Sequence, residues 1–172
     1  WLNRSLPPST AATPLRAISL GPRLARTVRG AHSAVALNSI GGFKLRDKQS
    51  RDALESMYAA TRDADLAAPG RDTFEALKLI EAIERQPYSP AGGALYPTSK
   101  FGSSLQQIAR LIKADAGVEV AFADIGGWDT HVGESQRLPG LLQDFAGSIG
   151  AFAADLGDRF EDVILVTMSE FG

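Results

Sequence analysis

The chain has 172 residues, of which 44% are hydrophobic, and this is enough to build one core of ordinary domain size. It has no cysteine, which excludes disulfides, thiolate zinc sites and cysteine nucleophiles, and no window approaches the roughly eighteen uninterrupted apolar residues of a membrane span. The net charge is only -2, but residues 1–50 hold eight Lys and Arg against one Asp, whereas residues 51–172 hold ten against nineteen acids. We therefore expect a single domain with a basic head and an acidic body. Because the chain begins at Trp1, we also expect it to be an internal fragment.

Residues 1–50 are predicted to be a loop-rich basic segment. They carry four prolines and Gly41-Gly42, and they show no sustained period of 3.6 or 2. The arginines of this segment are not interleaved with aromatic residues and match no nucleic-acid-binding module, so we expect no nucleic-acid partner. They are expected to pair with the acidic body or with other parts of the parent protein. They include Arg16, Arg23, Arg26 and Arg29.

Residues 51–117 are predicted to be a helical insertion. One amphipathic helix is expected from Gln49 to about Leu66, ended by Pro69-Gly70. A second begins with Asp72 as its N-cap and Glu75 in a capping box.

The second helix stops at Pro87, and a loop over residues 88–102 follows. A third helix is expected from about Ser103, with Gly117 near its C-terminus. His32, far from any acid in sequence, is interpreted as a surface or packing residue.

Residues 118–172 are predicted to form a βαβ core. Val118 to Ile125 and Asp162 to Met168 are short, apolar and rich in β-branched residues, as buried strands are. A helical period runs from Leu138 to Leu156 between them. A crossover helix makes two strands parallel, so their carboxyl ends meet at one edge, where open α/β sheets bind ligands.

The motif "GGWDTH" follows the first of these strands. Side chains two residues apart in an extended segment project to the same side, so Asp129 and His131 could converge on one metal ion. Oxygen and nitrogen ligands suit zinc, manganese or iron better than calcium. Gly126-Gly127 would allow a sharp bend, and Trp128 could wall one side. The alternative is a solvated polar loop with an incidental histidine.

Ser169 and Glu170 follow the second predicted strand. No G-x-S-x-G elbow surrounds Ser169, which argues against a serine hydrolase, and the catalytic nucleophile stays unknown. Glu170 is the stronger candidate, as a metal ligand or as an acceptor that orients a metal-bound histidine. Its alternative is an acid at the start of a helix.

These motifs resemble a family of bacterial secreted proteins called domain of unknown function 1501, of the alkaline-phosphatase-like and sulfatase-like superfamily. The similarity rests on "GGWDTH", "LPGLLQDFAGSIGAFAADLG" and "VILVTMSEFG", and extends to "WLNRSL", "AHSAVALNSIGGFKL" and "YPTSKFGSSLQQIARLIKADAGVEV". The resemblance implies a three-layer α/β sandwich, here truncated, with metal ions at the strand ends. Asp129 and His131 match an acid-and-histidine ligand pair, although relatives commonly have D-x-x-x-H. Ser169-Glu170 stands where many relatives have Asp-His.

The resemblance implies a metal-dependent hydrolase of phosphate or sulfate esters, with zinc or manganese as cofactor and a small-molecule or glycan ester as substrate. It implies a periplasmic or secreted protein, exported by a twin-arginine leader. The competing hypothesis is a secreted or surface protein that keeps the fold and binds a partner without catalysis. Because further ligands and the nucleophile would come from other strand ends, we expect this 172-residue piece alone to be inactive.

Overall fold

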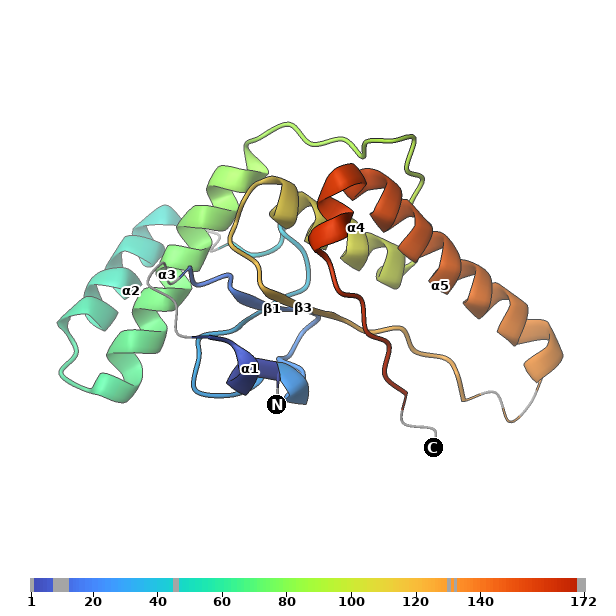
Figure 1. The fold of residues 1–172 in the computed structure, drawn as a ribbon. Helices are drawn as coiled ribbons and strands as arrows, with labels where there is room; N and C mark the ends of the chain where they lie inside the picture. Colours follow the sequence, from blue (N-terminus) through green and yellow to red (C-terminus); the bar gives the residue numbers. More distant parts are fainter. Residues whose placement is uncertain (1, 8–12, 45–46, 130, 132, 170–172) are drawn as a thin grey trace.

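The computed structural model describes residues 2–7, 13–44, 47–129, 131 and 133–169. Within these ranges the chain is mixed α/β, with a small parallel sheet surrounded by helices (Figure 1). The strands are β1 (Ala17–Leu20), β2 (Val35–Leu37) and β3 (Val120–Ala123), in the order β2-β1-β3. The α-helices are α1 (Leu2–Ser5), α2 (Lys48–Ala60), α3 (Ala64–Glu84), α4 (Lys100–Lys113) and α5 (Glu134–Leu156), and the 3-10 helices are η1 (Arg26–Val28) and η2 (Gly157–Asp162).

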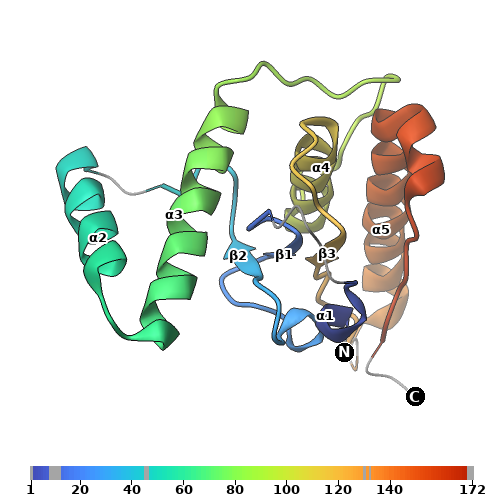
Figure 2. The ribbon, with the colours of Figure 1, turned by 60° about the vertical axis from the view of Figure 1, so that its left-hand side comes forward.

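The central strand β1 is buried along its whole length. Its register places Ile18 opposite Val35 of β2 and opposite Ala121 of β3. Ile18 is fully buried, and β1 as a whole packs beneath α3 and α4, which supply most of the remaining core. In Figure 2, α4 covers one face of the sheet, α3 flanks it beside β2, α5 lies on the opposite flank, and α1 lies below. Burial on both faces explains why this strand is not alternately apolar and charged: its one polar side chain, Ser19, is buried and hydrogen-bonded to the Arg23 carbonyl and the Ala25 N–H.

The hydrophobic core joins the sheet to α3, α4 and α5. Its buried members are Leu15, Ile18, Leu20, Leu37, Ile40, Ala76, Ile80, Ile83, Phe101, Leu105, Ile108, Ala109, Leu111, Ala116, Phe152 and Leu156. None of the helices in the described ranges is long and apolar enough to cross a membrane.

Helices α2 and α3 form a hairpin, which we call the helical arm, in which α2 lies on the side of α3 away from the sheet (Figure 2). Helix α2 packs on α3 through the ring of Tyr58, which contacts Phe74 at a centroid distance of 6.0 Å, and through the ion pair of Arg51 with Glu81. Gly70 makes this packing possible, because a Cβ at that position would overlap the Tyr58 ring. The predicted helix stop at Pro69-Gly70 is therefore wrong, since both residues lie inside α3.

Asp72 and Glu75 were predicted to begin a helix, and this is also wrong. Both lie well inside α3, which starts at Ala64. The Asp72 carboxylate instead accepts a hydrogen bond from the hydroxyl of Ser33. The helix does end before Pro87, as predicted, at Glu84.

The loop between α3 and α4 is fixed by a buried carboxylate. Asp155, in the last turn of α5, accepts hydrogen bonds from the Ala91 N–H at 2.7 Å, from Tyr96 Oη at 3.0 Å, and from the Tyr88 hydroxyl. It also pairs with Lys113 Nζ, at the end of α4, at 2.8 Å. One side chain thereby ties the loop and two helices together.

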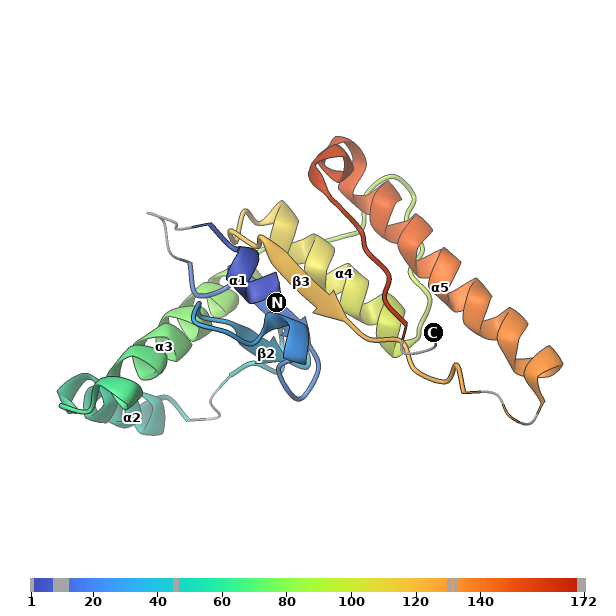
Figure 3. The ribbon, with the colours of Figure 1, turned by 60° about the horizontal axis from the view of Figure 1, so that its bottom comes forward.

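The strand predicted over Asp162 to Met168 does not form, and the C-terminal βαβ unit is wrong in that respect. Residues 157–162 form η2, and residues 163–169 make no strand ladder and run as a plain trace in Figure 3. Val163 packs partly against the core, but Ile164 is 92% exposed and Val166 is 68% exposed. The first half of the prediction holds, because β3 and the helix after it lie where the pattern placed them.

Candidate functional site

The carboxyl ends of the three parallel strands meet at one edge of the sheet. Leu20 of β1 is in register with both Leu37 of β2 and Ala123 of β3. The residues that follow these strands are therefore level with one another. They are Gly21 to Arg23, Asn38 and Ser39, and Asp124. This is the edge at which open α/β sheets bind ligands.

The loop after β3 is anchored to the helices by Trp128. Its indole Nε1 donates to the Ile125 carbonyl at 2.9 Å, and its ring meets Phe145 of α5 edge-on at 6.1 Å. Phe145 in turn stacks on Phe101 of α4 at 5.8 Å. Gly127 has φ of +94°, in the region that favours glycine, so the bend expected at the paired glycines is present. This aromatic row holds the start of the motif against the body of the protein.

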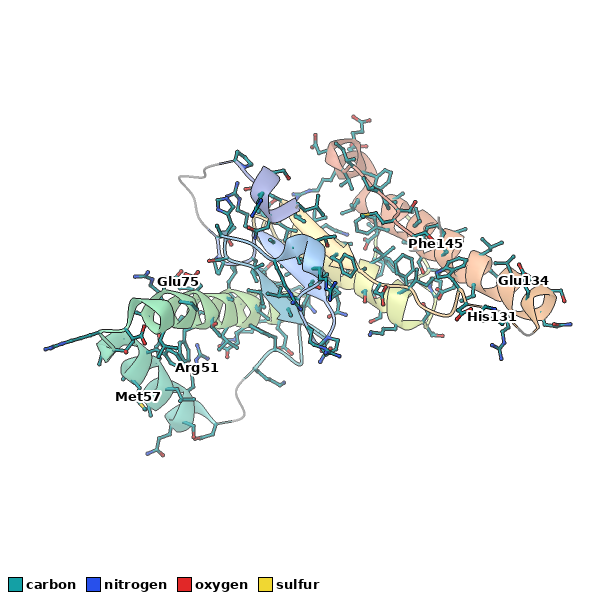
Figure 4. The ribbon with its side chains drawn as sticks, turned by 90° about the horizontal axis from the view of Figure 1, so that it is seen from below. Arg51, Met57, Glu75, His131, Glu134 and Phe145 are labelled. Carbon is teal, nitrogen blue, oxygen red and sulfur yellow. The ribbon has the colours of Figure 1, made fainter. Side chains whose placement is uncertain are left out.

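The structure brings the two predicted ligands together. His131 Nε2 lies 2.8 Å from Asp129 Oδ1, although His131 lies in a turn and not in the extended segment that we expected for the pair. Both are open to solvent, with side chains 89% and 63% exposed respectively. Figure 4 shows His131 beside Glu134, at the N-terminal end of α5. Residue 130 lies outside the described ranges.

The donor set of this pair fits a transition metal only in part. One carboxylate oxygen and one imidazole nitrogen are ligands that zinc and manganese accept. A zinc ion takes at least three protein ligands, and among the described residues no group of three His, Asp or Glu is close enough to hold an ion. The loop therefore supplies two ligands, and a complete metal site needs more.

The second predicted segment of the site is described only as far as Ser169. This serine is exposed and follows a stretch without strand pairing. Glu170 lies outside the described residues. The shared crevice that we expected between the carboxyl ends of β3 and of a second strand at 162–168 therefore has no basis in the sheet.

The sequence did not reveal the part of the edge formed by β1 and β2. Arg23, Asn38 and Ser39 follow strands of three or four residues, which lie in a segment predicted to be mostly loop. A buried run such as "AISL" is too short for a period to be recognised. A turn signal does follow it, since Gly21-Pro22 comes directly after β1.

His32 lies away from the carboxyl edge, in the segment that leads into β2. Its backbone N–H and carbonyl bind the side chain of Asn3, and the histidine lines a shallow cleft with Ser33, Asp72 and Glu75. Figure 4 places Glu75 on the far side of the molecule from His131. His32 is thus half-buried and packed, as interpreted from the sequence.

Comparison with known proteins gives one match. The family described as "Protein of unknown function (DUF1501)" matches residues 10–172. No curated protein and no solved structure matches the chain.

Proposed function

The chain belongs to the DUF1501 family, whose description assigns no activity, and we propose that it forms part of a metal-dependent hydrolase of phosphate or sulfate esters. The observation that carries the proposal is the Asp129–His131 pair, 2.8 Å apart on a loop at the carboxyl edge of a parallel sheet. The resemblance of the motifs to the alkaline-phosphatase-like and sulfatase-like superfamily supports a three-layer sandwich and a periplasmic or secreted location. Zinc or manganese is the proposed cofactor.

Asp129 and His131 would hold the metal from one side. The chemistry that a divalent ion would supply there is the polarisation of an ester oxygen and a lower pKa for an attacking hydroxyl or water. Trp128 keeps the first part of the loop in place by its hydrogen bond to Ile125 and its contact with Phe145. Glu134, in the first turn of α5 and three residues after His131, is the nearest further acid along the chain. We propose Glu170 as an additional ligand.

Metal binding is the direct test of this site. Titration calorimetry with Zn²⁺ and Mn²⁺ should show binding that weakens at least about tenfold in Asp129→Ala and in His131→Ala, because each variant removes one of two converging donors. Asp52→Ala, an exposed acid on the arm, and His32→Ala are matched controls and should bind metal as the wild type does. Equal affinity in all four variants would refute the assignment.

Hydrolysis separates an enzyme from a binding protein. The protein that contains this chain should hydrolyse an aryl phosphate or an aryl sulfate, and a chelator should abolish the reaction. The 172-residue chain should bind metal without hydrolysing either ester, because two ligands do not complete the site. A metal-loaded parent that is inactive toward a broad ester panel would favour the secreted binding protein instead.

A further inference from the structure

A group of exposed arginines surrounds the first connection of the sheet. Arg23 follows β1 by three residues, Arg26 opens η1, and Arg4 lies on α1. Helix α1 packs against η1, and the Asn3 side chain fixes this contact by donating to the Val28 carbonyl at 3.1 Å. The three arginines therefore belong to one small, well-packed substructure. We call it the arginine patch, defined as Arg4, Arg23 and Arg26.

The patch takes part in none of the ion pairs that the described part of the chain forms. Arg16 of the same segment pairs with Glu119, as we expected for the basic head, but in the described ranges Arg4, Arg23 and Arg26 have no ion-pair partner. All three are exposed, and the first acid along the chain is residue 47. Exposed like charges repel one another, so such a cluster favours a surface that meets an anion.

The position of the patch relates it to the carboxyl edge. Arg23 follows the end of β1, and the loop that bears Asp129 and His131 follows the end of β3, so both segments leave the sheet at the edge where Leu20 and Ala123 are in register. The connection is also held close to the sheet, since Ser19 Oγ donates to the Arg23 carbonyl at 3.3 Å and accepts from the Ala25 N–H at 3.3 Å. An extended anion could reach from the patch to this loop.

We propose that the arginine patch binds an acidic polysaccharide that carries repeated sulfate or phosphate monoesters. Guanidinium groups match the oxygens of both esters by paired hydrogen bonds, which makes arginine the residue suited to either. Described residues 2–7 and 13–34, which carry the patch, include no Phe, Tyr or Trp, whereas single-stranded nucleic acids are held by stacking on aromatic rings. The preference for a monoester rests on the proposed hydrolase function, because nucleic-acid backbones are diesters.

The test is a binding measurement that needs no catalysis. Dextran sulfate, phosphorylated dextran, unmodified dextran and duplex DNA of similar length are titrated in about 0.1 M salt with a chelator present. The wild-type chain should bind the two esterified dextrans, with weaker binding at higher salt, and should not bind unmodified dextran. The triple variant Arg4→Gln/Arg23→Gln/Arg26→Gln should lose at least about tenfold in affinity, because these exposed groups supply the ionic contacts.

A matched control changes the same charge elsewhere. Arg62, Arg71 and Arg85 are also exposed and lie on or beside the α2–α3 arm, far from the loop that bears His131. In the described ranges Arg62 and Arg71 lack ion-pair partners and Arg85 lies 3.9 Å from Glu81, and the triple glutamine variant should bind as the wild type does. Equal losses of affinity in both triple variants would overturn the proposal. It would also be overturned if the wild-type chain bound DNA more tightly than both esterified dextrans, or if it bound neither dextran. Arg29 is left in place because it donates to the Leu24 carbonyl, so the patch variant keeps its local fold.

The two proposals fail in different ways. The chelator removes any metal, so loss of metal binding in Asp129→Ala leaves the dextran experiment unchanged. If the patch binds dextran sulfate more tightly than phosphorylated dextran, the natural ligand is assigned to sulfated polysaccharides, and the reverse order assigns it to phosphorylated ones.

Discussion

Replacing Asp155 by alanine should cost this fold more than any other single change to a polar side chain. The carboxylate is completely buried, whereas its partner Lys113 keeps 27% of its side chain exposed. The Ala91 N–H and the hydroxyls of Tyr88 and Tyr96 complete its hydrogen bonds. The change to alanine removes one acceptor from α5 and leaves four donors without it, one on α4 and three in the loop between α3 and α4.

The size of the effect follows from those donors. Loss of one member of a buried ion pair costs about 3–5 kcal/mol, and an unpaired neutral donor costs about 1–3 kcal/mol. In the variant, Lys113 can regain some hydration because its side chain is partly exposed, and the Tyr88 hydroxyl can still donate to the Gln106 carbonyl at 3.3 Å. The total cost of the unpaired donors therefore lies near the lower end of these ranges. We expect a loss of about 4 kcal/mol in the free energy of unfolding, which lowers Tm by about 10 °C for a chain of this length.

The same group should make stability depend on pH. Burial raises the pKa of Asp155, but the hydrogen bonds from Lys113, Tyr88, the Ala91 N–H and Tyr96 outweigh it and hold the pKa below its usual value. A carboxyl whose pKa is lowered in the folded state stabilises the protein above its unfolded pKa of about 3.9, and this contribution disappears as the pH falls through the folded value. In Asp155→Asn, the free energy of unfolding should therefore fall less steeply than in the wild type as the pH is lowered below about 3.9.

Urea denaturation at pH 7, followed by circular dichroism, measures the first effect. Asp158→Ala, an exposed acid at the start of η2, is the control and should change the free energy of unfolding by less than about 0.5 kcal/mol. A loss below about 1 kcal/mol in Asp155→Ala, or an acid-side profile in Asp155→Asn that follows the wild type, would refute the reasoning.

Three further substitutions test the packing. Gly70→Ala should lower the free energy of unfolding by about 1–2 kcal/mol and increase hydrogen exchange in α2, because the new methyl group overlaps Tyr58. Gly140 is the equivalent Pro-Gly glycine of α5, and a Cβ there would have nothing within 4 Å. Gly140→Ala should therefore raise the free energy of unfolding by up to about 1 kcal/mol. Equal effects at the two glycines would contradict the packing of the arm. Ile164→Lys should change the unfolding free energy by less than about 0.5 kcal/mol because Ile164 is 92% exposed, and a loss above about 2 kcal/mol would show that this segment is a buried strand after all.

The long elements could be predicted from the sequence because their apolar periods are long. Helix α4 buries Leu105, Ile108 and Leu111, at the spacing that predicted it, although it begins at Lys100 with Ser99 as its cap rather than near Ser103. Strand β3 lies inside the predicted range of 118–125. In these cases local pattern and tertiary packing favour the same structure.

Pro69 was predicted to end a helix, but the effect of a proline depends on its position within the helix. Pro69 is the sixth residue of α3, where it removes one hydrogen bond near the start of the helix and leaves the rest intact. The cost is offset by the contact of Tyr58 with Gly70 and Phe74. Residues that belong to a different helix decide this outcome, so no local reading of "APGRD" could have shown it.

Residues 162–168 were predicted to be a strand and do not form one, because strand formation depends on a pairing partner as well as on apolar composition. An apolar run such as "VILVTM" indicates that a segment avoids water, but a strand also needs a neighbour that offers backbone hydrogen bonds. β1 provides that neighbour for β3, since their parallel register brings Leu20 level with Ala123. The carboxyl edge expected from a βαβ unit therefore exists, but β1 and β2 build it in place of residues 162–168. For this reason Asp129 and His131 share their edge with Arg23, whose segment had been predicted to be mostly loop, and the basic head becomes part of the proposed site.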